Sequence, residues 1–200
     1  MKWFAVLFLF AAPFWETKAP SDWSDDELRQ ILTDSPWAQM VSATGRGVAA
    51  PPIQVYLATA APMVEADRER DRRYKRKRPP AAPAVKDELA EEYRAWLEEN
   101  RATHIVLAVR MDNNRGFFDD KETRQMEEES VMYVGRKKIK MTGHFPPSPT
   151  DPYVRLAFPR QVGPSDKTVS FELYLPGVPN PFREAEFKVK DMMFKGKLEM

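Results

Sequence analysis

The chain has no cysteine, and this absence removes several classes of protein at once. Without a thiol there can be no disulfide bond, no thiolate metal ligand and no cysteine nucleophile. A bacterial lipoprotein anchor is also excluded, because that attachment requires a cysteine. The fold must therefore be held together by its apolar core, which a length of 200 residues permits.

Histidine and glycine are also scarce, with 2 and 8 residues respectively. The sequence has no H-E-x-x-H zinc motif, no G-x-S-x-G nucleophile motif and no glycine-rich nucleotide-binding loop. His104 opens a predicted strand and His144 lies beside a proline-rich stretch, so neither is predicted to bind a metal. No cofactor is predicted either.

Residues 112–116 (DNNRG) have a weak similarity to a calcium-binding loop. An EF-hand needs glycine at its sixth position and glutamate at its twelfth, whereas Gly116 is fifth and Thr123 is twelfth. A looser oxygen site remains an alternative to a simple polar turn. Its ligands would be Asp112, Asn114, Asp119 and Asp120.

Charge of one sign is not in excess, since the formal net charge is +1. This balance gives no general field that would attract nucleic acid.

Proline is abundant, at 18 residues. Because proline interrupts helices and the interior of sheets, the composition favours turns and stiff loops over long helices.

The N-terminus resembles a secretory signal. Lys2 precedes an apolar run over residues 3–12, which has the length of a signal core and is too short to span a bilayer. The alternative is a buried N-terminal strand or helix. Pro13 and Pro20 disfavour cleavage directly after Ala12 and Ala19. We expect a signal peptide at residues 1–19 and one α+β domain at residues 20–200, located in the periplasm or outside the cell.

Two main helices are predicted. Ser24 and Glu27 form a capping-box pattern ahead of a short amphipathic segment, and Trp23 is placed to pack on Leu28. Residues 34–37 (DSPW) are expected to restart or re-cap this helix. The second main helix covers residues 86–100, with an apolar stripe opposite several glutamates. Further helical turns are expected after Thr59 and over residues 121–128.

Alternating or apolar segments bounded by turns predict the strands. The clearest is residues 104–111, whose continuous apolar run is expected at the centre of a sheet with both faces covered. The others are residues 53–59, 131–141 as a pair broken at Gly135, 153–159, 168–175, 182–190 and 193–198. Residues 145–152 are expected to form an extended surface loop. The predicted class is α+β, an antiparallel sheet of five to seven strands with the two main helices packed on one face or end.

A basic run follows the predicted strand at residues 53–59, and it is the one candidate binding surface. Its positive side chains could bind anionic lipid, acidic polysaccharide or nucleic acid. Only Tyr74 offers a ring for base stacking, which argues against nucleic acid. The alternative is a solvated helix end whose charges face the acidic stretches 87–99 and 112–129. The candidate residues are Arg68, Arg70, Arg72, Arg73, Lys75, Arg76, Lys77 and Arg78.

Three stretches resemble exported proteins found mainly in Acidobacteria. They are residues 23–28 (WSDDEL) running on to 32–38 (LTDSPWA), residues 187–199 (FKVKDMMFKGKLE) and, more loosely, residues 54–66 (QVYLATAAPMVEA). The resemblance implies export and a single family unit, and it implies no activity.

The sequence therefore favours an exported, non-catalytic domain that binds a protein or an anionic surface polymer, and no catalytic residue is assigned. Two alternatives remain open. One is an extracytoplasmic hydrolase whose carboxylates meet only in the fold. The other is an envelope-associated structural factor held at the membrane surface by the basic run.

Overall fold

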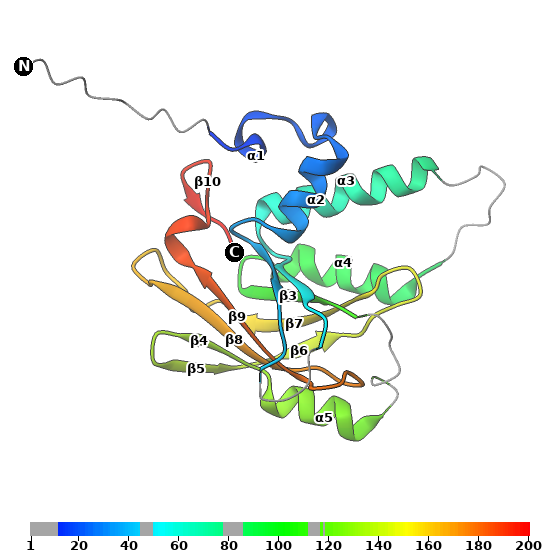
Figure 1. Ribbon diagram of the computed structural model, residues 1–200, viewed down its shortest axis with the longest axis vertical. Coiled ribbons are helices and arrows are strands. Elements are labelled where there is room, and N and C mark those ends of the chain that lie inside the picture. The colour runs from blue at the N-terminus through cyan, green and yellow to red at the C-terminus, as the bar shows by residue number, and fades with distance from the viewer. Residues whose placement is uncertain (1–11, 45–49, 78–85, 112–116, 118) are drawn as a thin grey trace, which may run out of the picture.

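The computed structural model describes residues 12–44, 50–77, 86–111, 117 and 119–200. Helices α2, α3 and α4 lie together on one side of the molecule, and α5 packs on β8 (Figure 1). The helices are α1 (Phe14–Thr17), α2 (Asp25–Thr33), α3 (Ala61–Lys77), α4 (Glu88–Asn100) and α5 (Asp120–Glu129), with short 3₁₀ turns at Pro20–Asp22 and Val189–Asp191.

All strand pairings among the described residues are antiparallel, and they form two sheets and a small hairpin. The first sheet has the order β1-β2-β3-β7-β6, and its strands are Ala38–Val41, Ile53–Leu57, His104–Arg110, Tyr153–Pro159 and Gly143–Phe145. The second has the order β5-β4-β8-β9, and its strands are Lys137–Lys140, Val131–Val134, Thr168–Tyr174 and Phe182–Lys188. The hairpin is β10 (Met193–Phe194) with β11 (Lys197–Leu198).

The predicted α+β class is therefore confirmed, but the strands divide between two sheets. The expected helix restart at residues 34–37 is wrong. Ser35 and Ala38 exchange backbone hydrogen bonds of 3.0 and 3.2 Å around a tight turn, and β1 begins at Ala38. Of the segment expected as an extended surface loop, only Phe145 belongs to a strand, the end of β6. Residues 146–152 are irregular as expected, but Ser148 is buried rather than at the surface.

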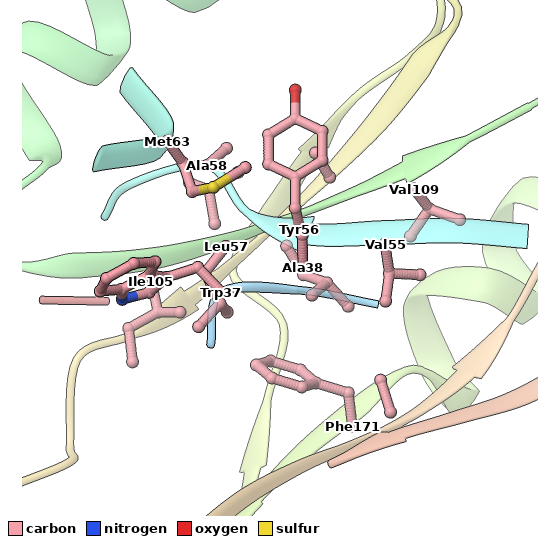
Figure 2. Packing of buried hydrophobic residues seen from close by; sticks show 14 of the residues in the cluster. Trp37, Ala38, Val55, Tyr56, Leu57, Ala58, Met63, Ile105, Val109 and Phe171 are labelled. Atoms are coloured by element: carbon pink, nitrogen blue, oxygen red, sulfur yellow. The ribbon is translucent and has the colours of Figure 1, made fainter. Parts of the chain in front are cut away.

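The first sheet has two buried faces, and the register assigns each residue to one of them. Tyr56, Ala108 and Arg155 stand opposite one another across β2, β3 and β7. Because side chains alternate along a strand, these three share the face that α3 and α4 cover. Figure 2 shows the Tyr56 ring on the opposite side of β2 from Val55, which lies on the side of Phe171. Phe171 belongs to β8, so this second face packs on the other sheet.

Local sequence explains the best-formed elements. The capping box at α2 is present, with Glu27 N donating to Ser24 Oγ at 3.0 Å and Ser24 N donating to Glu27 Oε2 at 2.8 Å. Strand β3 lies at the centre of its sheet with residues 105–109 fully buried, as its apolar run predicted. The turn at residues 163–166 is closed by Asp166, whose carboxylate accepts from Gly163 N at 2.8 Å.

Candidate functional site

The described part of the predicted basic run forms the C-terminal half of α3. Two of its arginines form hydrogen bonds within the protein. Arg72 Nε and Arg73 Nε donate to the two carboxylate oxygens of Glu69, at 2.7 and 2.6 Å. Glu69 is itself only 5 % exposed. These hydrogen bonds, first that of Arg72 and then that of Arg73, lower the pKa of Glu69 to about 2 despite its burial.

Arg73 also joins α3 to the start of α2. Its guanidinium donates to Asp25 Oδ1 at 2.6 Å and to the carbonyl oxygen of Trp23 at 2.5 Å. Acids on α3 itself and on the start of α2 thus partly neutralise the basic run. Among the described residues, the one ion pair between α3 and α4 joins Asp71 to Arg94 at 3.3 Å, so it uses an acid of α3 and not the basic run. Arg68, Lys75, Arg76 and Lys77 are exposed, and Arg78 lies outside the described residues.

A pocket of about 150 Å³ opens between α3 and α4 above the first sheet, and we call it the inter-helix pocket. Arg68 and Arg70 of the predicted site line it, together with residues the sequence did not indicate. The charged and polar members used below are Asp67, Asp71, Tyr93, Asp151 and Arg155.

The floor of this pocket holds a buried carboxylate. Asp67 Oδ2 accepts from the Tyr56 hydroxyl at 2.9 Å, and Asp67 Oδ1 forms an ion pair of 2.9 Å with Arg70. Burial raises the pKa of the Asp67 carboxyl, and the positive charges of Arg70 and then Arg155 oppose this rise. The group is therefore a buried acid held against two cations, a combination that is enriched at functional sites.

Arg155 is the second buried charge, and it reaches the floor from β7. Its Nη2 donates to Asp151 Oδ2 at 2.7 Å, and its guanidinium carbon lies 4.1 Å from the centre of the Tyr93 ring. Besides Asp67 Oδ1 and Arg70 Nη1, which meet in an ion pair without hydrogen-bond geometry, two buried polar atoms here make no hydrogen bond to any described residue: Arg155 Nε and the Tyr93 hydroxyl. Their residues are 5 and 6 % exposed. A buried donor without a partner is costly, so both atoms mark a place where a ligand or water would be held.

The candidate metal residues do not come together. Asp112 and Asn114 lie outside the described residues, and Asp119 caps α5 by accepting from Lys121 N at 2.9 Å. No cluster of three metal-ligating side chains occurs in the part of the chain that the structure describes.

Neither histidine belongs to such a site. His144 Nδ1 lies 3.2 Å from Glu127 Oε1. Burial lowers the pKa of His144, and the Glu127 carboxylate opposes that effect. The His104 ring packs edge-on against Trp96 at 5.2 Å.

Comparisons with known proteins return no match. No family model, curated protein or solved structure is similar to the chain. Among the described residues, no helix is both long and apolar enough to cross a membrane.

Sequence reasoning found the arginines of α3 but missed Tyr93 and Arg155. One signal for Arg155 was present, since it is the only charged residue in the otherwise apolar β7 segment YVRLAFP. A charge at a fully covered sheet position must have a partner, which makes such a residue a site candidate. Tyr93 lies within the predicted helix at residues 86–100, and it is buried and lines the pocket.

Proposed function

We propose that this chain is an exported, non-catalytic binding domain for an anionic polymer, whose acidic group enters the inter-helix pocket. The observation that carries the proposal is the pair of buried donors without partners, the Tyr93 hydroxyl and Arg155 Nε. Both can donate to a carboxylate, and the guanidinium supplies the positive charge that strengthens such a bond. The volume, about 150 Å³, is below the 300–1,000 Å³ that holds whole drug-sized ligands, so one acidic group fits best.

The exposed face of α3 supports a polymer rather than an isolated anion. Arg68 lines the pocket, and the exposed Lys75 follows it at a spacing of seven residues. Such a spacing puts side chains on one face of a helix. A chain of repeated acidic units would meet these cations in succession beyond the pocket. The resemblance to exported Acidobacteria proteins supports a location where surface polysaccharides occur.

The test measures binding of polygalacturonate, a polymer of carboxylated sugars, at low and physiological salt. We expect binding that weakens as salt rises, because exposed charges contribute. Tyr93→Phe removes the hydroxyl without changing charge and should weaken binding about 3- to 10-fold, the worth of one hydrogen bond. Tyr133→Phe, which removes a hydroxyl from the other sheet, should leave binding unchanged. Absence of binding at low salt would overturn the proposal.

One observation favours a second candidate function. Four carboxylates line the inter-helix pocket, those of Asp67, Asp71, Glu98 and Asp151, and the pKa of Asp67 is raised. A carboxyl that stays protonated at higher pH can act as a general acid in a hydrolase. In this case the wild-type protein would release reducing ends from polygalacturonate, and Asp67→Asn would not. Binding without cleavage supports the non-catalytic proposal.

The membrane-surface alternative depends only on the exposed basic side chains. Anionic phospholipid vesicles provide the comparison, because a flat charged surface cannot enter the inter-helix pocket. If vesicles bind and the Tyr93→Phe variant binds them as well as the wild type, the basic run is the binding surface. The proposal would then fail, and the envelope-associated role would replace it.

A further inference from the structure

A second and larger pocket lies where the two sheets end, and we call it the mouth pocket. It has a volume of about 600 Å³. Its walls come from β1, the start of β2, the residue after β3 and the connection from β8 to β9 (Figure 1). They are mainly apolar, with Met40, Pro51, Ile53, Met111 and Val178 among them.

One buried arginine stands in this apolar wall. Strand β9 alternates buried and exposed residues, and Arg183 occupies an inward position in line with Ala185 and Phe187. It is paired across the sheet with Leu173 and is only 1 % exposed. A position with these neighbours normally holds an apolar side chain. A buried charge is unfavourable unless it is paired, so Arg183 needs a hydrogen-bonding or anionic partner.

The described residues satisfy only one side of the Arg183 guanidinium. Its Nη1 donates to the carbonyl oxygens of Phe182, at 2.9 Å, and of Asn180. Nε and Nη2 have no hydrogen-bond partner among the described residues, and both atoms are buried, so a ligand would reach them only by displacing the side chains that cover them. These two atoms form the edge of a guanidinium that binds a carboxylate through two parallel hydrogen bonds.

The charged residues around Arg183 in the pocket wall are all positive. Arg110 and Arg183 are the charged residues among the described walls of the mouth pocket, with no aspartate or glutamate beside them. Burial lowers the pKa of Arg183, and no carboxylate opposes the effect. An uncompensated buried cation is unfavourable, so an anion at this position would be stabilising.

We propose that the mouth pocket binds an apolar chain that ends in a carboxylate, the carboxylate accepting hydrogen bonds from Nε and Nη2 of Arg183. The chain would lie against Met40, Ile53 and Val178. Met40 is 50 % exposed, so apolar surface continues outward from the pocket and a chain longer than the cavity can be accommodated. This site is separate from the inter-helix pocket, and neither binding activity requires the other.

The experiment compares decanoate with decanol, which has the same chain and no charge, by calorimetry on the full chain below their micelle concentrations. We expect decanoate to bind about 10- to 100-fold more tightly, since hydrogen bonds to a charged group are worth more than neutral ones. In Arg183→Met the two compounds should bind with about equal affinity, because the charge is lost while the wall stays apolar. Arg136→Met, which removes an exposed arginine at the turn between β4 and β5, should retain the wild-type preference.

Two outcomes would overturn the proposal: equal affinity for the two compounds in the wild type, or a preference that persists in Arg183→Met. If Arg183→Met does not fold, Arg183→Lys replaces it. Lysine keeps the charge but lacks the paired donors, so it should retain only part of the preference. An unchanged preference in Arg183→Lys would show that the guanidinium edge is not the binding group.

Discussion

The Tyr56 hydroxyl donates a hydrogen bond of 2.9 Å to Oδ2 of Asp67, joining β2 to α3 within the buried layer between sheet and helices. Tyr56 has no exposed surface. Asp67 Oδ1 also lies 2.9 Å from Arg70 Nη1, in an ion pair that lacks hydrogen-bond geometry. The Tyr56 hydrogen bond and the positive charge of Arg70 together let the layer contain an ionised acid.

Removing the hydroxyl should therefore destabilise the protein. Tyr56→Phe leaves Asp67 Oδ2 buried with one donor fewer, and the expected loss is about 1–3 kcal/mol in the free energy of unfolding. Urea denaturation measures it. Tyr133→Phe is the matched control, since its hydroxyl bonds Glu172 at 3.2 Å near the surface. A loss no larger than the control's would show that the Tyr56–Asp67 contact contributes nothing.

The pKa of Glu69 predicts how stability depends on pH. Its folded value of about 2 lies below the ordinary 4.5, so the ionised form stabilises the fold above pH 4.5. This contribution is lost progressively as the pH falls from 4.5 to 2 and amounts to about 3 kcal/mol. Glu69→Gln should remove most of that pH dependence. Unfolding free energies of both proteins at pH 7 and pH 3 are the measurement, and parallel curves would contradict the assignment.

The parts of the fold that depend on neighbouring residues were predictable. Ser24 and Glu27 are three residues apart, and their reciprocal bonds involve no other element. Strand β3 was recognised because its residues are apolar on both faces, which indicates a covered central strand. Helix α5 and the β4–β5 turn at Gly135 follow from similarly local signals.

The parts that depend on distant pairings were not predictable. Periodicity indicates a strand but not its neighbour, so the division into two sheets could not be inferred. At residues 34–37 the helical reading failed because Ser35 and Ala38 bond to each other. The candidate site was hidden for the same reason. Arg155 and Tyr93 are 62 positions apart in sequence, and their stacking depends on how α4 crosses β7.

Glu199 should stabilise the start of α3 from the far end of the chain. Residue 60, before this helix, is alanine and cannot cap it, and the Glu199 carboxylate accepts from Ala61 N at 3.0 Å instead. A negative charge there also complements the helix dipole. We expect Glu199→Ala to cost about 1 kcal/mol, within the range for lost N-caps.

The control for Glu199, which is half-buried, is an exposed glutamate on another element. Glu184→Ala removes a carboxylate from an outward position of β9 and should change stability by less than about 0.5 kcal/mol. Glu199→Gln keeps an acceptor oxygen, so it should lie between the wild type and Glu199→Ala. Urea denaturation orders the three variants, and equal values for the two alanine variants would contradict the capping role.

The residues just before the predicted domain boundary pack onto the fold. The Phe14 ring meets Trp23 edge-on at 5.7 Å, and the Trp15 ring meets Trp37 at 6.0 Å. Lys18 Nζ lies 2.5 Å from the Glu27 carboxylate. If the chain is exported as proposed, a cut after residue 19 would remove all of these contacts. We therefore expect the signal to be cut at residues 11–12 instead.

Two measurements check this expectation. Sequencing the N-terminus of the exported protein should give Ala12 as the first residue, because Pro13 disfavours cleavage after Ala12. A chain that starts at Pro13 should be about 2–4 kcal/mol more stable than one that starts at Pro20, because the shorter chain uncovers the Trp23 and Trp37 rings. Trp15→Ala in the longer chain should account for part of the difference. An exported protein beginning at Pro20, with stability equal to that of the longer chain, would show that these aromatic contacts play no part in the mature fold.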